Sequence, residues 1–375
     1  MTEIYLIRHT QAEGNLYRVM QGHWDGGVTE LGLRQIDLLA ERFKNVHIDA
    51  LYSSDLYRAR MTATAISRWH NIPIQTEPLL REINVGPWET KFFADVAYAQ
   101  PEKMQGFIAD QEHWQLDGAE TYSQVRDRAY PAFLRIAREN DGKVIAVVSH
   151  GVTIRCLLSR VTGYSLDDTE HIPLCANTGV SKLRYEDGRF TVEYVNDHSH
   201  LDSLALPPWS KTPELRAEPL DWEKDSAYYT DCYADAWKAA HGSLDHFTPE
   251  PYLRCAREHS KKDPNAVLKL YYKDQPAGLV DLDTARGAHA GYGWISLLYL
   301  TPEFRSRGCG VQLLGRAVFH YTGLGRHALR LHVAEDNKPA VEFYKRNGFQ
   351  LLSWEDNAAG RLLLMEKSLE EHRHV

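Results

Sequence analysis

A run of ten residues with three prolines, Leu204–Pro213 (LALPPWSKTP), most constrains how this chain can fold. Proline lacks a backbone N–H and fixes φ, so this run interrupts both helical and strand periodicity. The chain of 375 residues also exceeds the usual size of a single hydrophobic core. We therefore predict two domains, residues 1–202 and 213–375, joined by a linker at residues 203–212.

The first segment alternates strand and helix patterns, which predicts an α/β/α sandwich. Thr29 suits the N-cap of one helix, and Ser53 or Ser54 suits the N-cap of the next. The expected elements are a strand at Ile4–Ile7, a helix from Thr29 to about Phe43, a strand ending at Leu51–Tyr52, a helix at Asp55–His70, and strands at Val144–Val148 and Phe190–Val195.

The second segment has a mixed α/β pattern as well. Gly348 is expected just past the end of its last helix, where a left-handed backbone favours glycine. The expected strands are Leu215–Ala217, Ala266–Lys273, Ala277–Asp283, Trp294–Leu300 and Ala328–Val333, and the helices are Ala227–Ala240, Pro249–Ser260, one from about Gly310, and Pro339–Asn347.

Two histidines follow predicted strands of the first segment directly. Arg8-His9 comes after Ile4–Ile7, and His150 comes after Val144–Val148. Ligands of open α/β sheets gather at the carboxyl ends of the strands. Arg58 also lies near the start of a helix that follows a strand. These residues predict a phosphate pocket.

The chemistry of such a pocket is specific. A neutral imidazole, here His9, can attack phosphorus and form a phosphohistidine. The phosphoryl oxygens then need fixed positive charge and hydrogen-bond donors, which Arg8, Arg58 and His150 supply. An alkoxide leaving group needs a proton, and Glu82 is the candidate acid.

At these residues the sequence resembles the histidine phosphatase (phosphoglycerate-mutase-like) superfamily, over residues 1–202. The resemblance implies that His9 is the nucleophile, that Glu82 is the acid, and that Asn15, Gln21 and Gly22 belong to the substrate pocket. It rests on Arg8-His9-Thr10, Thr29–Gly32, Ser53–Ala59, Glu82 with Gly86–Glu89, Gly118–Thr121 and Ser149-His150-Gly151.

Three positions depart from the family pattern without removing a catalytic group. Thr10 and Thr90 replace glycines, and Ala12 lacks a hydroxyl that often stands there. The stretch between Glu89 and Gly118 is only of moderate length, whereas mutases usually carry a longer insertion over the substrate. A phosphatase is therefore favoured over a mutase, with Phe92–Gln115 as a lid whose aromatic residues set substrate preference.

A second candidate site follows strand Trp294–Leu300. Arg305, Arg307, Gly308, Cys309 and Gly310 form an R-x-R-G-x-G loop before a helix. Glycines allow backbone N–H groups to approach an anion, and the helix N-terminus adds its positive dipole. The loop therefore suits a pyrophosphate.

Two downstream residues strengthen this interpretation. Asn337 and Tyr344 follow the next strand, and a tyrosine hydroxyl can protonate a departing thiolate. Asn337 also suits the N-cap of the last helix. Together these spacings resemble the GNAT N-acetyltransferase superfamily, over residues 213–368. The resemblance implies acetyl-CoA as co-substrate and a splayed sheet, with pantetheine beside the backbone of Tyr299 and Leu300.

A general base for acetyl transfer is harder to assign. The strand Trp294–Leu300 carries no carboxylate, while Asp281 and Asp283 on the preceding strand suit either a base or a solvated strand face. The leading hypothesis is a bifunctional enzyme. The alternatives are a mutase in the first half, or a second half that senses acyl-CoA and regulates the phosphatase without chemistry.

Composition limits the partners. A net charge of −8 disfavours a general nucleic-acid binder, and no stretch approaches the ~20 apolar residues of a membrane span. Five scattered cysteines without a CxxC pair favour a reducing, cytoplasmic setting and disfavour a zinc site. We expect a small phosphorylated metabolite and an amine acceptor as partners, and no metal ion.

Overall fold

The computed structural model describes residues 1–204, 212–357 and 360–369. The chain divides into two compact units, one of Met1–Phe92 and Val96–Pro207, the other of Phe93–Asp95 and Pro208–Val375. Most of the predicted linker, residues 203–212, lies outside the described residues. The domain bounds therefore stay a prediction.

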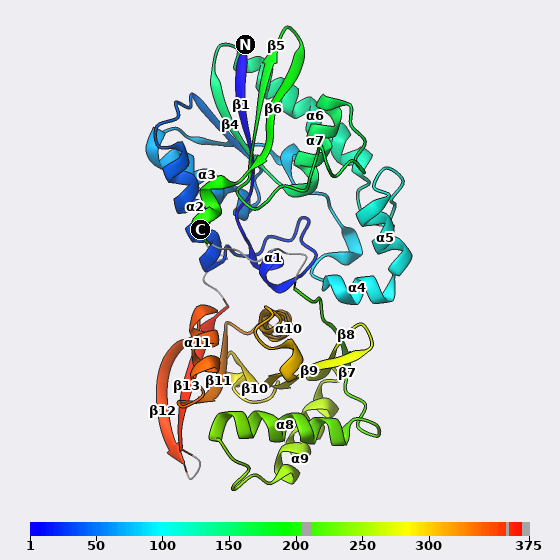
Figure 1. Ribbon diagram of the computed structural model, residues 1–375, viewed down its shortest axis with the longest axis vertical. Helices are drawn as coiled ribbons and strands as arrows, with labels where there is room; N and C mark the ends of the chain where they lie inside the picture. Colours follow the sequence, from blue (N-terminus) through cyan, green and yellow to red (C-terminus); the bar gives the residue numbers. More distant parts are fainter. Residues whose placement is uncertain (205–211, 358–359, 370–375) are drawn as a thin grey trace. The chain divides into compact units, whose positions relative to one another are not determined.

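The first unit alternates strands and helices along the chain (Figure 1). Its elements are β1 (Thr2–Arg8), α1 (Glu13–Tyr17), α2 (Glu30–Phe43), β2 (Ala50–Ser53), α3 (Tyr57–His70), β3 (Ile74–Thr76), α4 (Phe93–Ala99), α5 (Pro101–Ala109), α6 (Tyr122–Glu139), β4 (Val144–Ser149), α7 (Gly151–Thr162), β5 (Val180–Glu186) and β6 (Arg189–Asp197).

A six-stranded mixed sheet of the described residues has the order β3-β2-β4-β1-β5-β6. The pairs among β3, β2, β4 and β1 are parallel, and β5 and β6 are antiparallel. Ile4 and Leu6 pack towards α6 and α7, whereas Ile7 packs towards α2 and α3. Helices therefore cover both faces (Figure 1), and the predicted α/β/α sandwich is confirmed.

One predicted helix start in this unit is wrong. Helix α3 begins at Tyr57, and its N-cap position is Leu56, which has no side-chain oxygen. The Ser54 hydroxyl lies 2.8 Å from Nε2 of His150, and only a weak 3.4 Å bond joins it to the backbone N–H of Leu56. Ser54, one of the two expected caps, therefore contacts mainly His150, a residue distant in the sequence. The Thr29 cap is confirmed, since Thr29 accepts from Gly32 N–H at 3.0 Å.

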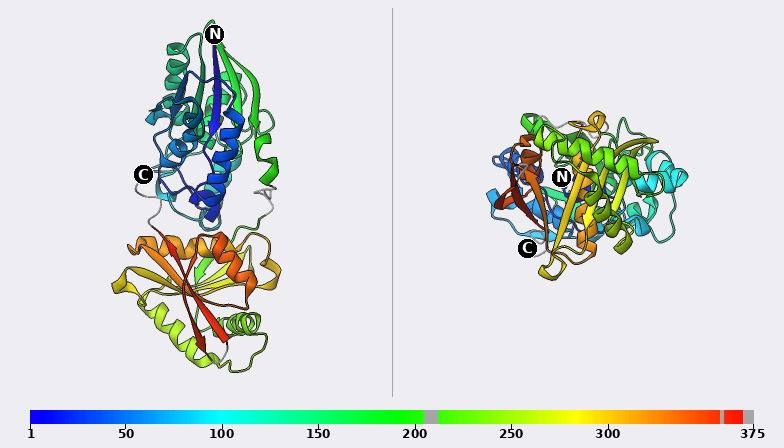
Figure 2. Two further views of the ribbon diagram at one scale, coloured as in Figure 1. Left: turned by 90° about the vertical axis from the view of Figure 1, so that its left-hand side faces the viewer. Right: turned by 90° about the horizontal axis from the view of Figure 1, so that it is seen from below.

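The second unit is a mixed α/β fold, with α8 and α9 on one face of its sheet and α10 on the other (Figures 1 and 2). Its elements are β7 (Arg216–Pro219), α8 (Ser226–His241), α9 (Pro249–Lys262), β8 (Val267–Tyr272), β9 (Gln275–Asp283), β10 (Tyr292–Leu300), α10 (Gly310–Gly323), β11 (Ala328–Ala334), α11 (Lys338–Arg346), β12 (Gln350–Asn357) and β13 (Gly360–Ser368).

The seven-stranded sheet of this unit has the order β12-β13-β11-β10-β9-β8-β7. Among the strands of this sheet that the structure describes, only the pair β10–β11 is parallel. The predicted caps of α11 are confirmed: Asn337 accepts from the N–H of Ala340, and Gly348 has φ of 84°. The hairpin β12–β13 was not predicted, because its mixed polar and apolar residues lack clear alternation.

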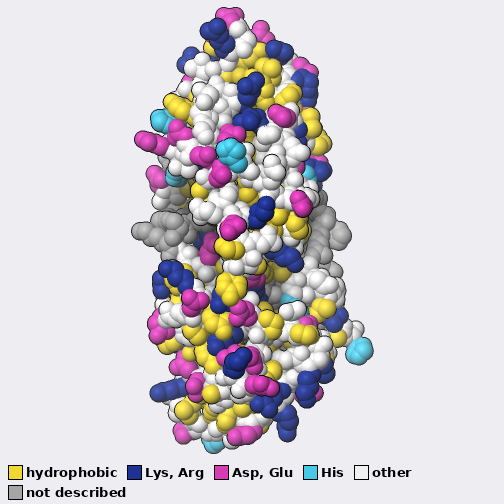
Figure 3. All heavy atoms as spheres, turned by 90° about the vertical axis from the view of Figure 1, so that its right-hand side faces the viewer, with side chains coloured by type: hydrophobic (Ala, Val, Ile, Leu, Met, Phe, Trp, Pro, Cys, Tyr) yellow, Lys and Arg dark blue, Asp and Glu magenta, His cyan; other side chains and the backbone are white. Residues whose placement is uncertain are grey.

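The described surface is that of an ordinary charged protein. No helix of the described residues is long and apolar enough to cross a membrane. On the face drawn in Figure 3, Lys and Arg side chains are interspersed with Asp and Glu side chains.

Candidate active sites

His9 and His150 come together because β1 and β4 are parallel neighbours. Arg8 is in register with Ser149, and the N–H of His9 donates to the carbonyl of Ser149 at 2.9 Å. The two imidazole rings, which follow these strand ends, lie 5.1 Å apart between centroids. Both side chains are buried. The sheet register thus brings the two predicted histidines together.

The hydrogen bonds of His9 define its tautomer. Nδ1 lies 2.6 Å from the carbonyl oxygen of Thr10, which can only accept, so Nδ1 carries the proton. Burial, Arg58 and Arg8 together hold the pKa of His9 well below its usual value. The ring is therefore neutral at pH 7, and the lone pair of Nε2 is available for attack.

His150 is prepared as a donor. Its Nε2 lies 2.8 Å from the Ser54 hydroxyl, and its Nδ1 is buried without a hydrogen-bond partner among the described residues. Burial, Arg58 and the His9 ring hold the pKa of His150 well below its usual value. If the Ser54 hydroxyl donates to Nε2, the neutral ring carries its proton on Nδ1, ready for an incoming oxygen.

Two buried guanidinium groups supply the positive charge. Arg8 donates to the carbonyl of Cys175, and Arg58 donates to the carbonyls of Gly22 and Trp24 at 2.7 and 3.1 Å. The Nε atoms of both arginines are buried without partners in the described part of the chain. Burial lowers the pKa of Arg58 to about 10, so it stays protonated at pH 7. Buried donors of this kind need an acceptor.

A loop at Gly22–Trp24 is fixed from two sides. Arg58 binds its carbonyls, while the Glu89 carboxylate accepts from the N–H groups of Gly22, His23 and Trp24 at 3.2, 2.7 and 3.0 Å. A Cβ at Gly22 would lie 2.3 Å from Glu89 Oε1 and from the carbonyl oxygen of Ile83. Glycine is therefore required there. Glu89 was not predicted as a site residue.

The side chains of Gln21 and Asn15 differ in their hydrogen bonding. Both polar atoms of the Gln21 amide are buried without a partner among the described residues. Asn15 uses Oδ1 to accept from the N–H of Ala12 at 3.0 Å and from Asn177 at 3.4 Å. The Gln21 amide thus keeps unsatisfied hydrogen-bonding groups among the described residues, whereas Oδ1 of Asn15 holds the backbone after β1.

Glu82 lies against the N-terminus of α7, directly after His150. Its carboxylate accepts from the N–H groups of Val152 and Thr153, both at 3.1 Å. The buried side chain is therefore fixed beside the second histidine. Arg128 donates to the Glu82 carbonyl at 2.8 Å, which holds the backbone of the acid as well.

The aromatic residues expected in a lid mainly pack on one another. Phe107 and Trp114 form a ring cluster with Trp88 and Tyr122, with centroids 5.0 to 6.1 Å apart. Tyr98 is exposed. For Phe107 and Trp114 the contacts therefore indicate a packing role.

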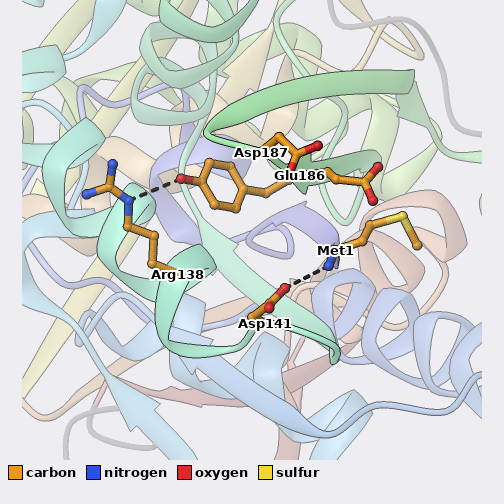
Figure 4. Close-up of a pocket in the computed structure, with 6 residues that line it drawn as sticks. Met1, Arg138, Asp141, Glu186 and Asp187 are labelled. Carbon is orange, nitrogen blue, oxygen red and sulfur yellow. Dashed lines mark hydrogen bonds and ion pairs between the residues drawn. The ribbon is translucent and has the colours of Figure 1, made fainter.

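A separate pocket in this unit has the wrong charge for phosphate (Figure 4). Met1, Arg138, Asp141, Tyr185, Glu186 and Asp187 line it, and the N-terminal ammonium binds Asp141 at 2.7 Å. It lies at the start of β1, whereas His9 follows the end of β1, roughly 20 Å away at strand spacing. Its carboxylates repel anions.

The second unit opens a fork in its sheet. β10 pairs with β11 only over Tyr292–Ile295 and Ala328–Leu331, although both strands continue. Tyr299 and Leu300 lie on the open part of β10 and pair with β9 on the other side. This is the splay that the sequence resemblance implies.

The predicted pyrophosphate loop lies at the end of that open strand. Ser306 and Gly308 have φ of 57° and 76°, and the side chain of Cys309, at the N-cap position of α10, makes no cap hydrogen bond. The N-terminus of a helix suits an anion. The backbone of the loop therefore fits the phosphates of a CoA thioester.

The side chains of the loop point elsewhere. Arg305 binds Asp235 and the Leu300 carbonyl, and Arg307 donates to the Glu303 carbonyl at 3.3 Å. Cys309 is buried with weak contacts to carbonyls. Burial raises the pKa of Tyr344, so its hydroxyl stays protonated at pH 7. Its ring packs on Phe343 and Phe349.

Comparison with known proteins assigns both units. Residues 4–198, just over half of the chain, match the model of the histidine phosphatase superfamily (branch 1). The chain belongs to the histidine phosphatase superfamily. Residues 222–349 match the acetyltransferase (GNAT) family, so a GNAT domain follows the histidine phosphatase domain.

Individual relatives align with the histidine phosphatase domain. A metal-independent phosphoserine phosphatase of Arabidopsis thaliana is 31% identical over 209 residues, 55% of this chain and 86% of that protein. A probable phosphoglycerate mutase of Yersinia pestis is 29% identical over 55% of this chain and 98% of its own length. The solved YhfR protein of Bacillus stearothermophilus is 30% identical, with a TM-score of 0.52, covering 54% of this chain and 100% of that one.

The GNAT domain contains a buried charge cluster that single residues of the sequence do not reveal. Asp281 accepts from Tyr229 at 2.8 Å and lies 2.7 Å from Nδ1 of His259, whose Nε2 is 3.4 Å from Asp283. Burial alone lowers the pKa of His259, but the Asp281 hydrogen bond and the two carboxylates raise it overall. Asp281 and Asp283 thus favour the protonated form of His259.

Proposed function

We propose that the histidine phosphatase domain hydrolyses small phosphomonoesters through a phosphohistidine at His9. The carrying observation is the neutral His9 ring, with its proton fixed on Nδ1 by Thr10, beside unpartnered donors of Arg8, Arg58 and His150. A nucleophile and preorganised positive charge are the two requirements of this reaction.

Each residue then has one role. Nε2 of His9 attacks phosphorus, while Arg8, Arg58 and His150 Nδ1 bind the phosphoryl oxygens. Glu82 in its acid form gives a proton to the departing alkoxide and takes one from the water that hydrolyses the phosphohistidine. The two arginines supply the positive charge and His150 supplies a neutral donor, so the reaction as drawn needs no metal ion. The name of the Arabidopsis relative agrees with this.

The substrate class follows from the named relatives. Phosphoserine and phosphoglycerate are both small phosphomonoesters that bear a carboxylate, and these names motivate the same class for this chain. The aromatic packing of Phe107 and Trp114 leaves no described aromatic cage for a large hydrophobic group in that part of the lid.

The test is an assay of the full chain with phosphoserine, 3-phosphoglycerate and p-nitrophenyl phosphate. We expect release of inorganic phosphate and a phosphohistidine on His9 after rapid quenching. An isomerised phosphoglycerate in place of free phosphate would establish a mutase instead. Absence of both products and of the phosphohistidine would refute the proposal.

We further propose that the GNAT domain transfers an acetyl group from acetyl-CoA to an amine. The fork of β10 and the N-terminus of α10 would hold the co-substrate, which supplies an activated thioester. The Tyr344 hydroxyl is kept in the protonated form that an acid role requires.

Calorimetry with CoA and thiol release in an amine panel test this second activity. Wild type should bind CoA and release thiol, and Tyr344→Phe should bind CoA but lose most of the transfer rate. Binding without any transfer in wild type would favour the acyl-CoA-sensing alternative. Absence of CoA binding would refute both interpretations.

A further inference from the structure

One histidine stands at the base of the fork between β10 and β11. Leu331 pairs with Ile295 in the last parallel pair, and His332 is the next residue of β11. The open edge of β10 runs from the base of the fork to Leu300, and the predicted pyrophosphate loop follows Leu300. A molecule held at that loop and extended along the edge therefore presents its far end to His332.

The His332 side chain lies on the same face of the sheet as Trp294. The two rings are 5.0 Å apart between centroids and perpendicular, at 90°. Glu355 on β12 brings Oε1 to 3.6 Å from Nδ1 of His332. The imidazole is 23% exposed, so it is supported by neighbours and still reachable from solvent.

The charge state of His332 suits proton uptake. Burial lowers its pKa, and Arg286 acts in the same direction, while Glu355 opposes both. Arg286 stacks on Trp294, with Cζ 3.3 Å from the ring centroid. The ring is therefore neutral at pH 7, and the Glu355 carboxylate can stabilise the imidazolium that forms.

His259, which is more deeply buried than His332, lacks that property. It has carboxylates at both ring nitrogens, from Asp281 and Asp283, and its pKa is raised despite burial. With a carboxylate facing each nitrogen, the ring directs no lone pair towards a substrate proton. Its role is to join α9 to β9.

We propose that His332, supported by Glu355, is the proton acceptor for the amine in the GNAT domain, an inference that rests on the proposed acetyl transfer. One proton of the acceptor ammonium passes to His332. The freed nitrogen forms the N–C bond as the C–S bond breaks, and the Tyr344 hydroxyl protonates the sulfur. The second nitrogen proton restores that hydroxyl, and the proton on His332 leaves to solvent.

Carbethoxylation of histidines by diethylpyrocarbonate tests the position of His332 without any acceptor. The full chain is treated at pH 7 with and without CoA, and the rate at each histidine is followed by peptide mass spectrometry. With CoA at about ten times its Kd, we expect His332 to react about tenfold more slowly. The exposed His289 is the matched control and should react at an unchanged rate.

A second measurement tests the chemistry. With an amine found in the panel, His332→Gln should lower kcat/KM about 100-fold and abolish the rise of kcat/KM with pH, while CoA affinity stays unchanged. Glu355→Gln should lower the pKa of His332 in NMR titrations of the free chain. His289→Gln should match wild type in kcat/KM and its pH dependence, in CoA affinity, and in the NMR titration of His332.

The failures are distinguishable. If CoA does not bind the chain, the proposed acetyl transfer itself is refuted. If CoA binds but leaves His332 carbethoxylation unchanged, or if His332→Gln retains the wild-type pH profile, this inference alone is overturned.

Discussion

The rings of His9 and His150 lie 5.1 Å apart, although 141 positions separate the two residues in the chain. This proximity follows from the parallel register of β1 and β4, which brings Arg8 beside Ser149. A single phosphoryl group placed between the rings would meet a nucleophile on one side and a donor on the other. The predictions for the first domain start from this pair.

Replacing His9 by alanine should abolish the phosphohistidine and lower kcat by more than about 10⁴-fold, because the other neutral imidazole beside it, His150, has its Nε2 engaged by the Ser54 hydroxyl. Quenched-flow mass spectrometry and phosphate release measure both effects. His113→Gln, at an imidazole with 83% of its side chain exposed, is the control and should keep full activity. Normal turnover in His9→Ala would mean that another residue is the nucleophile.

Glu82→Gln should separate substrates by their leaving groups. Its loss should lower kcat/KM, which reports the steps up to release of the alcohol, about 10²- to 10⁴-fold for phosphoserine, whose alkoxide needs a proton, but by at most about tenfold for p-nitrophenyl phosphate. Steady-state assays with both substrates measure the ratio. Equal losses on both would contradict an acid role, and Glu102→Gln on the exposed side of α5 serves as the control.

Glu89→Gln should loosen the substrate loop without removing the nucleophile. A glutamine amide nitrogen cannot accept the N–H bonds that Glu89 now receives from Gly22, His23 and Trp24. We expect kcat/KM to fall about 10- to 100-fold, mainly through a higher KM, as for lost charged hydrogen bonds. Phosphohistidine should still form at high substrate concentration. An unchanged KM would argue that the loop stays in place without this carboxylate.

Acid should destabilise the first domain through its buried histidines. His9 and His150 have pKa values held well below the ordinary 6.5, so the unfolded chain binds more protons once the pH falls through 6.5. Above pH 6.5 the two histidines do not lower the free energy of unfolding. As the pH falls from 6.5 towards their pKa values in the folded chain, each histidine lowers it by at most about 1.4 kcal/mol per pH unit.

Urea unfolding at pH 7, 6 and 5 checks this sign. His150→Gln should lose less free energy of unfolding than wild type between pH 7 and pH 5, because glutamine does not titrate. Wild type and variant share all other titrating groups, so the difference between their slopes of unfolding free energy against pH reports His150. A steeper loss in the variant would reverse the assignment of His150 as a neutral buried ring.

Local patterns in the sequence predict most of the strands and helices that carry the sites, and the order of the chemical groups along the chain. Apolar runs followed by Arg8-His9 and Ser149-His150 indicate strand ends, and local propensities suffice to predict the Thr29 and Asn337 caps. The same local information misplaced the start of α3. There the Ser54 hydroxyl contacts His150 across the sheet, and no local pattern records a contact of that range.

The preparation of these groups for chemistry depends on contacts that form only in the folded chain. The proton of His9 is fixed by the Thr10 carbonyl, the substrate loop is fixed by Glu89, and His332 lies at the fork because β10 and β11 stop pairing after Ile295 and Leu331. Charge state, tautomer and strand register depend on burial and on partners distant in the chain. Residue spacing places groups near one another, but packing determines which of them carries a proton and which has a free lone pair.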